Sequence, residues 1–195
     1  MTRTAEISRR TGETDISLKL TLDGSGGGTR ATGVGYFDHL LDALARHGGL
    51  DIDVEAQGDL QTGAHHTVED TGLVLGLALD EALGERAGIT RFGHAVVPMD
   101  EARAAAAVDV SGRPFTRFEG PFPEAAIADF DAGLCQEFLR AVATTAKLTL
   151  HVAIEAPGND HHVVEAAVKA FARSLRAAIA IDPAMSGVPS TKGSL

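Results

Sequence analysis

Two kinds of hydrophobic spacing alternate along the chain and predict its strands and helices. Between Asp15 and Asp23 every second residue is apolar, which is the period of a strand with one buried face. Between Tyr36 and His47 the apolar residues recur at helical spacing, and Gly48-Gly49 ends the pattern. The same reading predicts strands over 4–10, 15–23, 30–35, 50–56, 91–97, 103–110, 115–119 and 148–155, and helices over 36–47, 67–86, 132–147 and 161–180.

The order of these elements occurs twice. Each half is predicted as β-β-β-α-β-α, and residues 39–54 align without a gap on residues 137–152. Leu41 then falls on Leu139, and Leu50 on Leu148. Because internal repeats dictate architecture, we predict an α+β fold made by internal duplication of a half-domain, with sheets packed against helices. Residues 1–90 form the first half and 91–195 the second half with a C-terminal tail, together one compact unit.

A His-His-x-x-Glu motif also occurs twice, at residues 65–69 and 161–165. Imidazole and carboxylate are the usual protein ligands of divalent transition metals. Since positions i and i+3 share a helix face, we predict that His66 and Glu69 point one way while His65 points elsewhere, with the same split in the second copy. One motif could then serve two different metal ions.

The repeat alignment nominates a further ligand in each half. His39 falls on Glu137, so we predict that the two positions are equivalent, one an imidazole and the other a carboxylate. A single half supplies too few ligands for a closed site, so the halves must pool their ligands, within one chain or across a subunit boundary. Mixed imidazole and carboxylate sites with more than four ligands suit manganese or iron better than structural zinc.

Composition excludes several other classes of function. The net charge is −10 and no block of lysine or arginine occurs, which argues against nucleic-acid binding. No apolar run approaches the length of a membrane span, and the N-terminal segment lacks a hydrophobic signal core, so we expect no membrane partner and a cytoplasmic location. The single cysteine, Cys135, cannot form an internal disulfide and is interpreted as a small buried hydrophobe.

Basic residues near predicted turns form a candidate anion site. Each of them alone is a solvated charge, but in an acidic chain a converging set could hold an anionic substrate, phosphate above all. Lys169 follows Glu165 by one helical turn and is the strongest candidate, and the segment 190–193 has the composition of an anion clamp. The other candidates are Arg91, Arg113 and Lys192.

Two other functions remain as alternatives to an enzyme that holds separated metal ions and an anionic substrate. A two-metal phosphate-ester hydrolase needs ions about 3.5–4 Å apart, whereas the split of each His-His pair favours separated ions. A non-catalytic metal-binding shell of the ferritin type needs four long helices, which the predicted strands contradict.

Longer motifs give the chain a resemblance to a known enzyme family. They include Arg9-Arg10-Thr11-Gly12-Glu13-Thr14, Phe37-Asp38-His39-Leu40-Leu41, His65-His66-Thr67-Val68-Glu69-Asp70, Pro98-Met99-Asp100-Glu101, Asp109-Val110-Ser111-Gly112-Arg113-Pro114, Asn159-Asp160-His161-His162-Val163-Val164-Glu165-Ala166 and Ser186-Gly187-Val188-Pro189-Ser190-Thr191-Lys192-Gly193. Over nearly its whole length the chain resembles the imidazoleglycerol-phosphate dehydratases, hydro-lyases of histidine biosynthesis.

The resemblance implies a fold, a reaction and an assembly. The fold is a duplicated α+β domain, similar to domain 2 of ribosomal protein S5. The reaction removes water from D-erythro-imidazoleglycerol phosphate and gives imidazole acetol phosphate. The resemblance also implies two Mn²⁺ ions per active site, located at subunit interfaces, and a 24-subunit assembly of octahedral symmetry.

The resemblance also assigns roles to residues. The metal ligands fall on His39, His65, His66, Glu69, Glu137, His161, His162 and Glu165, although the family often has histidine where Glu137 stands. The phosphate contacts fall on Arg91, Arg113, Lys169, Ser190 and Lys192. Glu13 matches the family's acid/base carboxylate and is expected to contact substrate, while His39, Glu69 and Glu165 are expected to act in catalysis as ligands.

A chemical route fits these roles. Metal bonds to the ring nitrogens would favour an imidazolate, which can expel the hydroxide from the carbon attached to the ring and give a diazafulvene-like intermediate. A base such as Glu13 would then take the proton of the neighbouring carbon, and the enol would tautomerise to the ketone.

Overall fold

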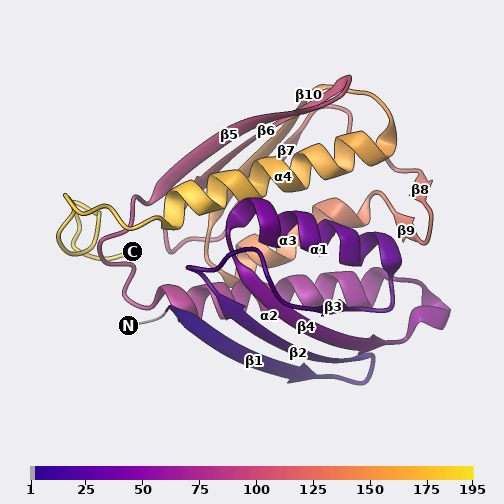
Figure 1. Cartoon of the computed structure of the whole chain (residues 1–195), viewed down its shortest axis with the longest axis horizontal. Helices are drawn as coiled ribbons and strands as arrows, with labels where there is room; N and C mark the ends of the chain where they lie inside the picture. The colour runs from indigo at the N-terminus through magenta and orange to yellow at the C-terminus, as the bar shows by residue number, and fades with distance from the viewer. Residues whose placement is uncertain (1–2) are drawn as a thin grey trace.

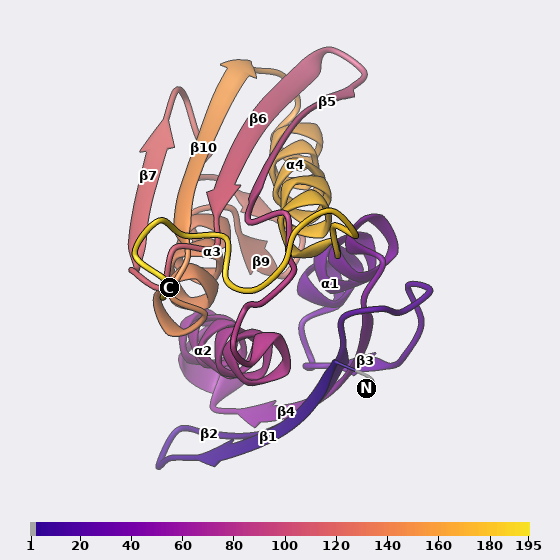
Figure 2. The ribbon, with the colours of Figure 1, turned by 90° about the vertical axis from the view of Figure 1, so that its left-hand side faces the viewer.

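Four helices lie between two β-sheets in this protein. The structure is a computed structural model that describes residues 3–195, so the first two residues of the predicted first half lie outside it. Figures 1 and 2 show the two sheets on opposite outer sides of the molecule and the helices between them. The predicted α+β class, with sheets packed against helices, is confirmed.

Each sheet is built from one half of the chain, and the two sheets have the same strand order. The first has the order β1-β2-β4-β3 and the second the order β5-β6-β10-β7. In both, the last strand of the order is parallel to its neighbour and the other pairs are antiparallel. This equivalence is what a duplication predicts. The strands are β1 (Thr4–Arg10), β2 (Thr14–Thr21), β3 (Arg30–Ala31), β4 (Asp51–Gly58), β5 (Phe92–Met99), β6 (Ala102–Asp109), β7 (Phe115–Glu119) and β10 (Thr149–Ala156).

The helices join the two halves into one unit. They are α1 (Gly35–Gly48), α2 (His65–Leu83), α3 (Leu134–Thr145) and α4 (Asp160–Ile179). Helix α2 covers the first sheet and α4 the second, while α2 packs on α3 and α1 packs on α4. Each of these helix–helix contacts joins the first half to the second. In the described part of the chain, no helix is long and apolar enough to cross a membrane.

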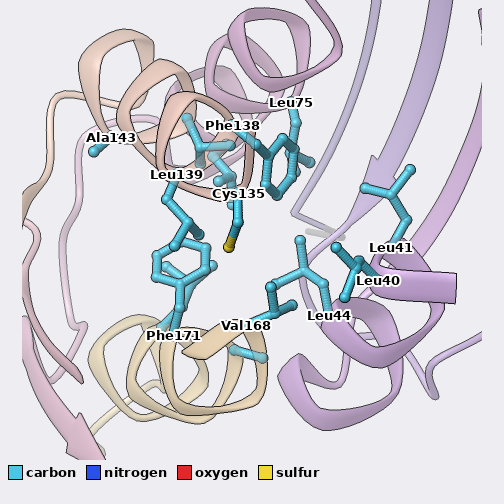
Figure 3. Packing of buried hydrophobic residues seen from close by; sticks show 14 of the residues in the cluster. Leu40, Leu41, Leu44, Leu75, Cys135, Phe138, Leu139, Ala143, Val168 and Phe171 are labelled. Carbon is cyan, nitrogen blue, oxygen red and sulfur yellow. The ribbon is translucent and has the colours of Figure 1, made fainter. Parts of the chain in front are cut away.

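The hydrophobic core lies where the four helices meet. Figure 3 shows Leu44 of α1, Phe138 and Cys135 of α3, and Phe171 of α4 directed into this interior. Burial raises the pKa of the Cys135 thiol to about 12, so the thiol stays protonated and unreactive at neutral pH. The interpretation of Cys135 as a small buried hydrophobe is confirmed.

Two glycines let α2 and α3 approach closely. A Cβ on Gly72 would lie 2.8 Å from the carbonyl oxygen of Phe138, and one on Gly76 would lie 2.5 Å from the carbonyl oxygen of Val142. Both contacts are with backbone, which a change of rotamer cannot relieve. The spacing of the two halves therefore depends on the absence of side chains here.

The ends of α1 and α3 are equivalent turns with different residues. After α1, Gly49 takes a left-handed conformation with φ 66°, and Leu50 N–H donates to the Ala45 carbonyl at 3.0 Å. After α3, Lys147 takes a similar φ of 56°, and Leu148 N–H donates to the Ala143 carbonyl at 2.9 Å. The repeat alignment pairs these same positions, so the backbone geometry of the turn is common to both halves.

The predicted boundaries differ from the structure where glycines interrupt a pattern. Helix α2 was predicted to continue to residue 86 but ends at Leu83, because Gly84 takes a positive φ of 51°. The predicted strand 30–35 is reduced to β3, because Gly33 has φ 80°. Three short elements were missed, since their few residues carry no periodic pattern: the 3₁₀ helix η1 (Leu60–Thr62), β8 (Ala126–Ile127) and β9 (Phe130–Asp131).

Candidate active site

The first candidate metal centre joins α1 and α4. His39 Nε2 and His161 Nε2 each lie 3.1 Å from Glu165 Oε2. Potential ligand atoms of these three residues all lie within 4.8 Å of one another. We call them the α1–α4 cluster. The packing of α1 on α4 therefore brings a histidine of the first half to the second motif, and two imidazoles and a carboxylate surround one point.

A lysine beside this cluster keeps its carboxylate charged. Lys169 Nζ lies 2.6 Å from Glu165 Oε1, on the next turn of α4. Burial of Glu165 opposes ionisation, but the hydrogen bonds from Lys169 and His39 outweigh it and lower the pKa of Glu165 to about 2. Glu165 is thus an anion at any physiological pH, as a metal ligand must be.

Tyr36 supports the same cluster and was not among the predicted site residues. Its ring centroid lies 4.9 Å from that of His161, and its hydroxyl donates to the His161 carbonyl at 3.2 Å. Burial raises the pKa of the Tyr36 phenol, which keeps this donor protonated. The sequence offered only a weak signal, an aromatic residue one turn before His39.

The second candidate centre lies between the start of α4 and the β5–β6 turn. His162 Nδ1 lies 3.2 and 3.1 Å from the two carboxylate oxygens of Glu101, and His162 Nε2 lies 3.8 Å from Asp100 Oδ2. We call these three residues the β5–β6 group. Glu101 also accepts hydrogen bonds from the backbone N–H of Asn159 and from its own N–H, and these bonds with that of His162 lower the pKa of Glu101 to about 2.

The first half carries a corresponding set at the start of α2, which we call the first-half group. His65 Nε2 lies 3.3 Å from Glu69 Oε2. His66 Nδ1 lies 3.1 Å from both oxygens of Asp59, and His66 Nε2 lies 3.8 Å from Glu13 Oε1. The hydrogen bond to Asp59 raises the pKa of His66 and lowers that of Asp59. The β1–β2 turn thus brings Glu13 to the first motif, as the β5–β6 turn brings Asp100 to the second.

The structure corrects the pairing predicted within each motif. His65 pairs with Glu69 and His161 with Glu165, so the partners are four residues apart and not three. Four residues come about 40° from a whole number of helical turns, whereas three fall about 60° short. The predicted divergence of neighbouring histidines does hold, because the two histidines of each pair meet different acids. His65 meets Glu69 and His66 meets Asp59, while His161 meets Glu165 and His162 meets Glu101. The two ring planes of each pair are 86° apart.

Glu137 stands apart from these groups. It lies on α3 and pairs with Arg140 on the same helix. Among residues 3–195, no cluster of three or more potential metal ligands includes Glu137. A ligand role for Glu137 would require donors from beyond this single chain.

Most of the predicted phosphate residues gather near the start of β5, which is the opposite end of that strand from the β5–β6 group. Arg91 donates to Asp109 at 2.8 Å and to the Pro189 carbonyl at 2.9 Å, which holds the C-terminal tail beside the start of β5. Ser190 Oγ accepts from the Lys192 N–H at 3.2 Å. The tail also packs on the Ser111–Arg113 turn, because a Cβ on Gly112 would lie 2.3 Å from the Leu195 carbonyl carbon.

Lys169 does not join them. Its Nζ lies 3.8 Å from the sulfur of Met99, the last residue of β5. Arg91 precedes the first residue of β5, and the strand has 8 residues. Arg91 N–H donates to the Ala178 carbonyl at 2.8 Å, and Ala178 follows Lys169 by nine residues on α4. At about 1.5 Å per residue, roughly 14 Å of helix separate the Lys169 backbone from the Arg91 region, and the Lys169 side chain reaches the other way, to Glu165. Figure 1 shows the C-terminal tail at the left and the starts of α2 and α4 at the right.

Three carboxylates of these groups were not predicted as site residues: Asp59, Asp100 and Glu101. Asp100 and Glu101 occur in one of the longer motifs, but nothing local in the sequence reveals that they face His162. Aligning the β1–β2 and β5–β6 turns, which carry Glu13 and Asp100, would have supplied a signal for the second turn.

Comparison with known proteins shows the family to which this chain is similar. The family model described as imidazoleglycerol-phosphate dehydratase matches residues 32–175. The imidazoleglycerol-phosphate dehydratase of Methanoculleus marisnigri is 53% identical over 99% of this chain and 100% of its own length. That of Acidiphilium cryptum is 54% identical over 100% of both chains.

Solved structures give the same result. The crystal structure of imidazoleglycerol-phosphate dehydratase from Staphylococcus aureus has a TM-score of 0.83 at 35% identity, covering 92% of this chain and 99% of that one. The enzyme from Pyrococcus furiosus has a TM-score of 0.83 at 36% identity, covering 97% of this chain and 100% of that one. With the family model, full-length relatives and fold in agreement, this chain belongs to the imidazoleglycerol-phosphate dehydratase family, the hydro-lyases that remove water from imidazoleglycerol phosphate in histidine biosynthesis.

Proposed function

We propose that this dehydratase depends on manganese, with two Mn²⁺ ions per active site. The observation that carries the proposal is the α1–α4 cluster, where His39, His161 and Glu165 surround one point from two helices. Two imidazoles and one carboxylate form a donor set that suits manganese or iron. The clustered atoms leave room for further ligands, as expected for an ion with more than four.

We assign the other ligands to the second histidine of the second motif and to the residues of the first motif. His162 would serve a second ion with the imidazole nitrogen that faces Asp100, and His65, His66 and Glu69 would supply the corresponding donors of the first half. Glu137, partly exposed on α3, is the further carboxylate that the repeat alignment nominates. Bound metal would supply positive charge at the substrate's ring nitrogens, and so favour loss of a proton from the ring.

The residues of this chain position the substrate and move its proton. Glu13 is 57% exposed at its side chain and has its Oε1 near His66, so it can reach a molecule held at the first motif. We assign Glu13 as the base that removes the proton from the carbon adjacent to the one that loses hydroxide. Lys169, beside Glu165, provides positive charge near the α1–α4 cluster, while Arg91, Arg113, Ser190 and Lys192 form the phosphate clamp.

One chain cannot assemble this site alone. Arg91 lies next to the start of β5 and the β5–β6 group follows its end, roughly 25 Å away. Glu165 of the α1–α4 cluster stands 13 residues, roughly 20 Å of helix, before Ala178, whose carbonyl accepts from the Arg91 N–H. A substrate of one imidazole ring, three carbons and one phosphate is shorter than either separation. The phosphate clamp of one subunit must therefore meet the metal groups of another. The 24-subunit assembly implied by the family resemblance would meet this need, and a cytoplasmic location suits reduced Cys135.

Chelation tests the metal dependence. The wild-type protein is stripped of metal, assayed for the enolisable ketone product and for free phosphate, and assayed again after Mn²⁺ is restored. We expect ketone formation to be lost and then regained, without phosphate release. Full turnover in protein with no detectable bound ion would refute the manganese proposal, and phosphate release would favour the hydrolase alternative.

A mixing experiment tests the shared site. Arg91→Ala disables the clamp and Glu165→Gln disables the α1–α4 cluster, so each homo-oligomer should have little activity. Subunits mixed under dissociating conditions and reassembled should regain part of the wild-type activity, because some interfaces would combine an intact clamp with an intact cluster. If mixed assemblies stay as inactive as either parent, the site is not shared in this way.

A further inference from the structure

In each motif, the second histidine has its Nδ1 against a carboxylate. His66 Nδ1 lies 3.1 Å from both oxygens of Asp59, and His162 Nδ1 lies 3.2 and 3.1 Å from those of Glu101. A carboxylate can only accept a hydrogen bond, so each Nδ1 carries the proton. In the neutral imidazole, which is the form that binds a metal, Nε2 on the other side of the ring is then the nitrogen with the lone pair.

The two carboxylates come from positions that the repeat does not relate. Asp59 follows β4, in the link that leads directly to α2, whereas Glu101 lies in the turn between β5 and β6. The counterpart of the β5–β6 turn in the first half is the β1–β2 turn, and that turn brings Glu13 to the Nε2 side of His66. Inheritance from a common half therefore does not explain why both Nδ1 atoms meet a carboxylate. The two halves place a carboxylate at the same ring nitrogen with residues of different segments, which indicates a requirement on the histidine.

Both carboxylates are held in place by further contacts. Glu101 Oε1 accepts from the Asn159 N–H at 2.6 Å, immediately before α4. Gly158 permits this approach, because a Cβ there would lie 2.4 Å from Glu101 Oε1. Asp59 Oδ2 accepts from the Thr62 hydroxyl at 3.0 Å. A fixed acceptor fixes the plane of the ring that donates to it.

The Nε2 side of each ring faces a different acid. Glu13 Oε1 lies 3.8 Å from His66 Nε2, and Asp100 Oδ2 lies 3.8 Å from His162 Nε2. These distances exceed a hydrogen bond and leave each Nε2 lone pair available. Each ring thus has an orienting acid behind it and an open, negatively charged space ahead.

We infer that Asp59 and Glu101 are positioning residues, which hold His66 and His162 in the tautomer and orientation that present Nε2 to a divalent cation. The inference rests on the proposed function, which places manganese at these histidines. It adds that the two acids bind the imidazole rings and are not themselves ligands of the ion. Outer carboxylates of this kind change metal affinity by about 10–100-fold when removed.

Metal affinity provides the test, with Mn²⁺ alone as the probe. Full-length, metal-free wild-type protein and the variants Glu101→Ala, Glu101→Gln, Asp59→Ala and Asp59→Asn are titrated, and free Mn²⁺ is followed by its electron paramagnetic resonance signal. Each alanine variant should lose about tenfold or more in affinity for part of the bound manganese. Each amide variant should stay within a few-fold of wild type, because its carbonyl oxygen still accepts from Nδ1–H. The control is Glu155→Ala, an exposed acid of β10 paired with Arg103 of the neighbouring β6, which should leave the affinity unchanged.

A second readout separates positioning from loss of structure. Saturating Mn²⁺ should restore most of the kcat of the alanine variants, and the thermal midpoint of the metal-free variants should show that they are folded. The inference is overturned if folded alanine variants bind Mn²⁺ as tightly as wild type. It is also overturned if the amide variants lose as much affinity as the alanine variants, since the acids would then be direct ligands. Wild-type protein that binds no Mn²⁺ would instead refute the proposed function, and this inference with it.

Discussion

A buried acid one residue after the first motif ties the turn that carries Glu13 to α2. Asp70 is 9% exposed and accepts a hydrogen bond from the Thr14 hydroxyl at 2.5 Å. Its Oδ2 lies 2.6 Å from Arg9 Nη1. Arg9 and Thr14 stand on either side of the β1–β2 turn, so Asp70→Ala should loosen this turn from the helix. Alanine fits the backbone at this position, because Ala166 occupies the equivalent place in the second half and is fully buried.

The expected loss follows from the two contacts. A hydrogen bond to a charged group contributes about 1.5–3 kcal/mol. Thr14 is 3% exposed, so water cannot replace its partner, and that contact should count nearly in full. The Arg9 side chain is 33% exposed, so solvent replaces part of its ion pair. We therefore expect a loss of about 2–3 kcal/mol in the free energy of unfolding, or roughly 5–10 °C in the thermal midpoint for a chain of this size.

The assay compares Asp70→Ala with Asp15→Ala. Asp15 lies in the same hairpin and pairs with Arg10 at 3.5 Å, but both side chains are more than half exposed, so its loss should change stability by less than about 0.5 kcal/mol. Thermal midpoints of the metal-free proteins at equal concentration and the kcat of the manganese-loaded proteins are measured together. Asp70→Ala should lower both quantities and Asp15→Ala neither. If Asp70→Ala unfolded within about 1 °C of wild type, the energetic reasoning would be wrong. If the stability of Asp70→Ala fell but its kcat did not, the contacts of Asp70 with Thr14 and Arg9 would not position Glu13.

Three further predictions concern the packing of α2 on α3, the stability of the protein at acidic pH and the catalytic role of Glu13. Gly76→Ala should destabilise the protein by about 1–2 kcal/mol in thermal unfolding, because overpacking against the Val142 carbonyl outweighs the gain of about 1 kcal/mol in helix propensity. The added Cβ would also lie 2.1 Å from the Thr145 hydroxyl, but Thr145→Ala should not restore the wild-type midpoint, since the Val142 carbonyl at 2.5 Å remains, and a fully restored midpoint would contradict the assigned contact. The folded pKa of Glu165, about 2 against an ordinary 4.5, means that its charge stabilises the metal-free protein fully above pH 4.5 and progressively less as the pH falls toward 2. Thermal midpoints measured between these pH values should therefore fall less steeply for Glu165→Gln, and parallel curves would count against this role. Glu13→Gln should lower kcat by about 10²–10⁴ while leaving KM and manganese content close to wild type, and a kcat within a few-fold of wild type would remove Glu13 from the chemistry.

The sequence predicted those features of the fold that depend on local spacing. The helical periodicity of Phe37, Leu40 and Leu44 predicted α1 correctly, and all three side chains are at most 1% exposed. The gapless alignment of 39–54 on 137–152 anticipated two sheets of the same strand order. Glycines that end a pattern early, such as Gly84, were the main source of wrong boundaries, because nothing in the hydrophobic spacing signals a positive φ.

The candidate site was less accessible to such reasoning because its contacts are distant in sequence. His39 could be nominated by alignment, but its approach to Glu165 depends on how α1 packs on α4. Glu101 meets His162 only through the β5–β6 turn, and a turn gives no sign of which helix start it faces. The separation of Lys169 from Arg91 was hidden for the same reason, since sequence spacing does not reveal that the Lys169 side chain reaches Met99 at the end of β5 while Arg91 precedes its start.

The left-handed residue after α3 has a consequence for how the halves depend on each other. Lys147 adopts a conformation that disfavours any side chain by about 1 kcal/mol, where the first half has glycine. Its ammonium group lies 2.6 Å from Asp80, a residue of α2 in the opposite half. An ion pair with this exposure contributes up to about 1 kcal/mol, which is comparable to the strain. In the second half, a residue whose backbone strain is offset by an ion pair with the first half therefore stands where the first half has an unstrained glycine. A fragment starting at residue 91 would keep the strain at Lys147 and lose the ion pair with Asp80 that offsets it.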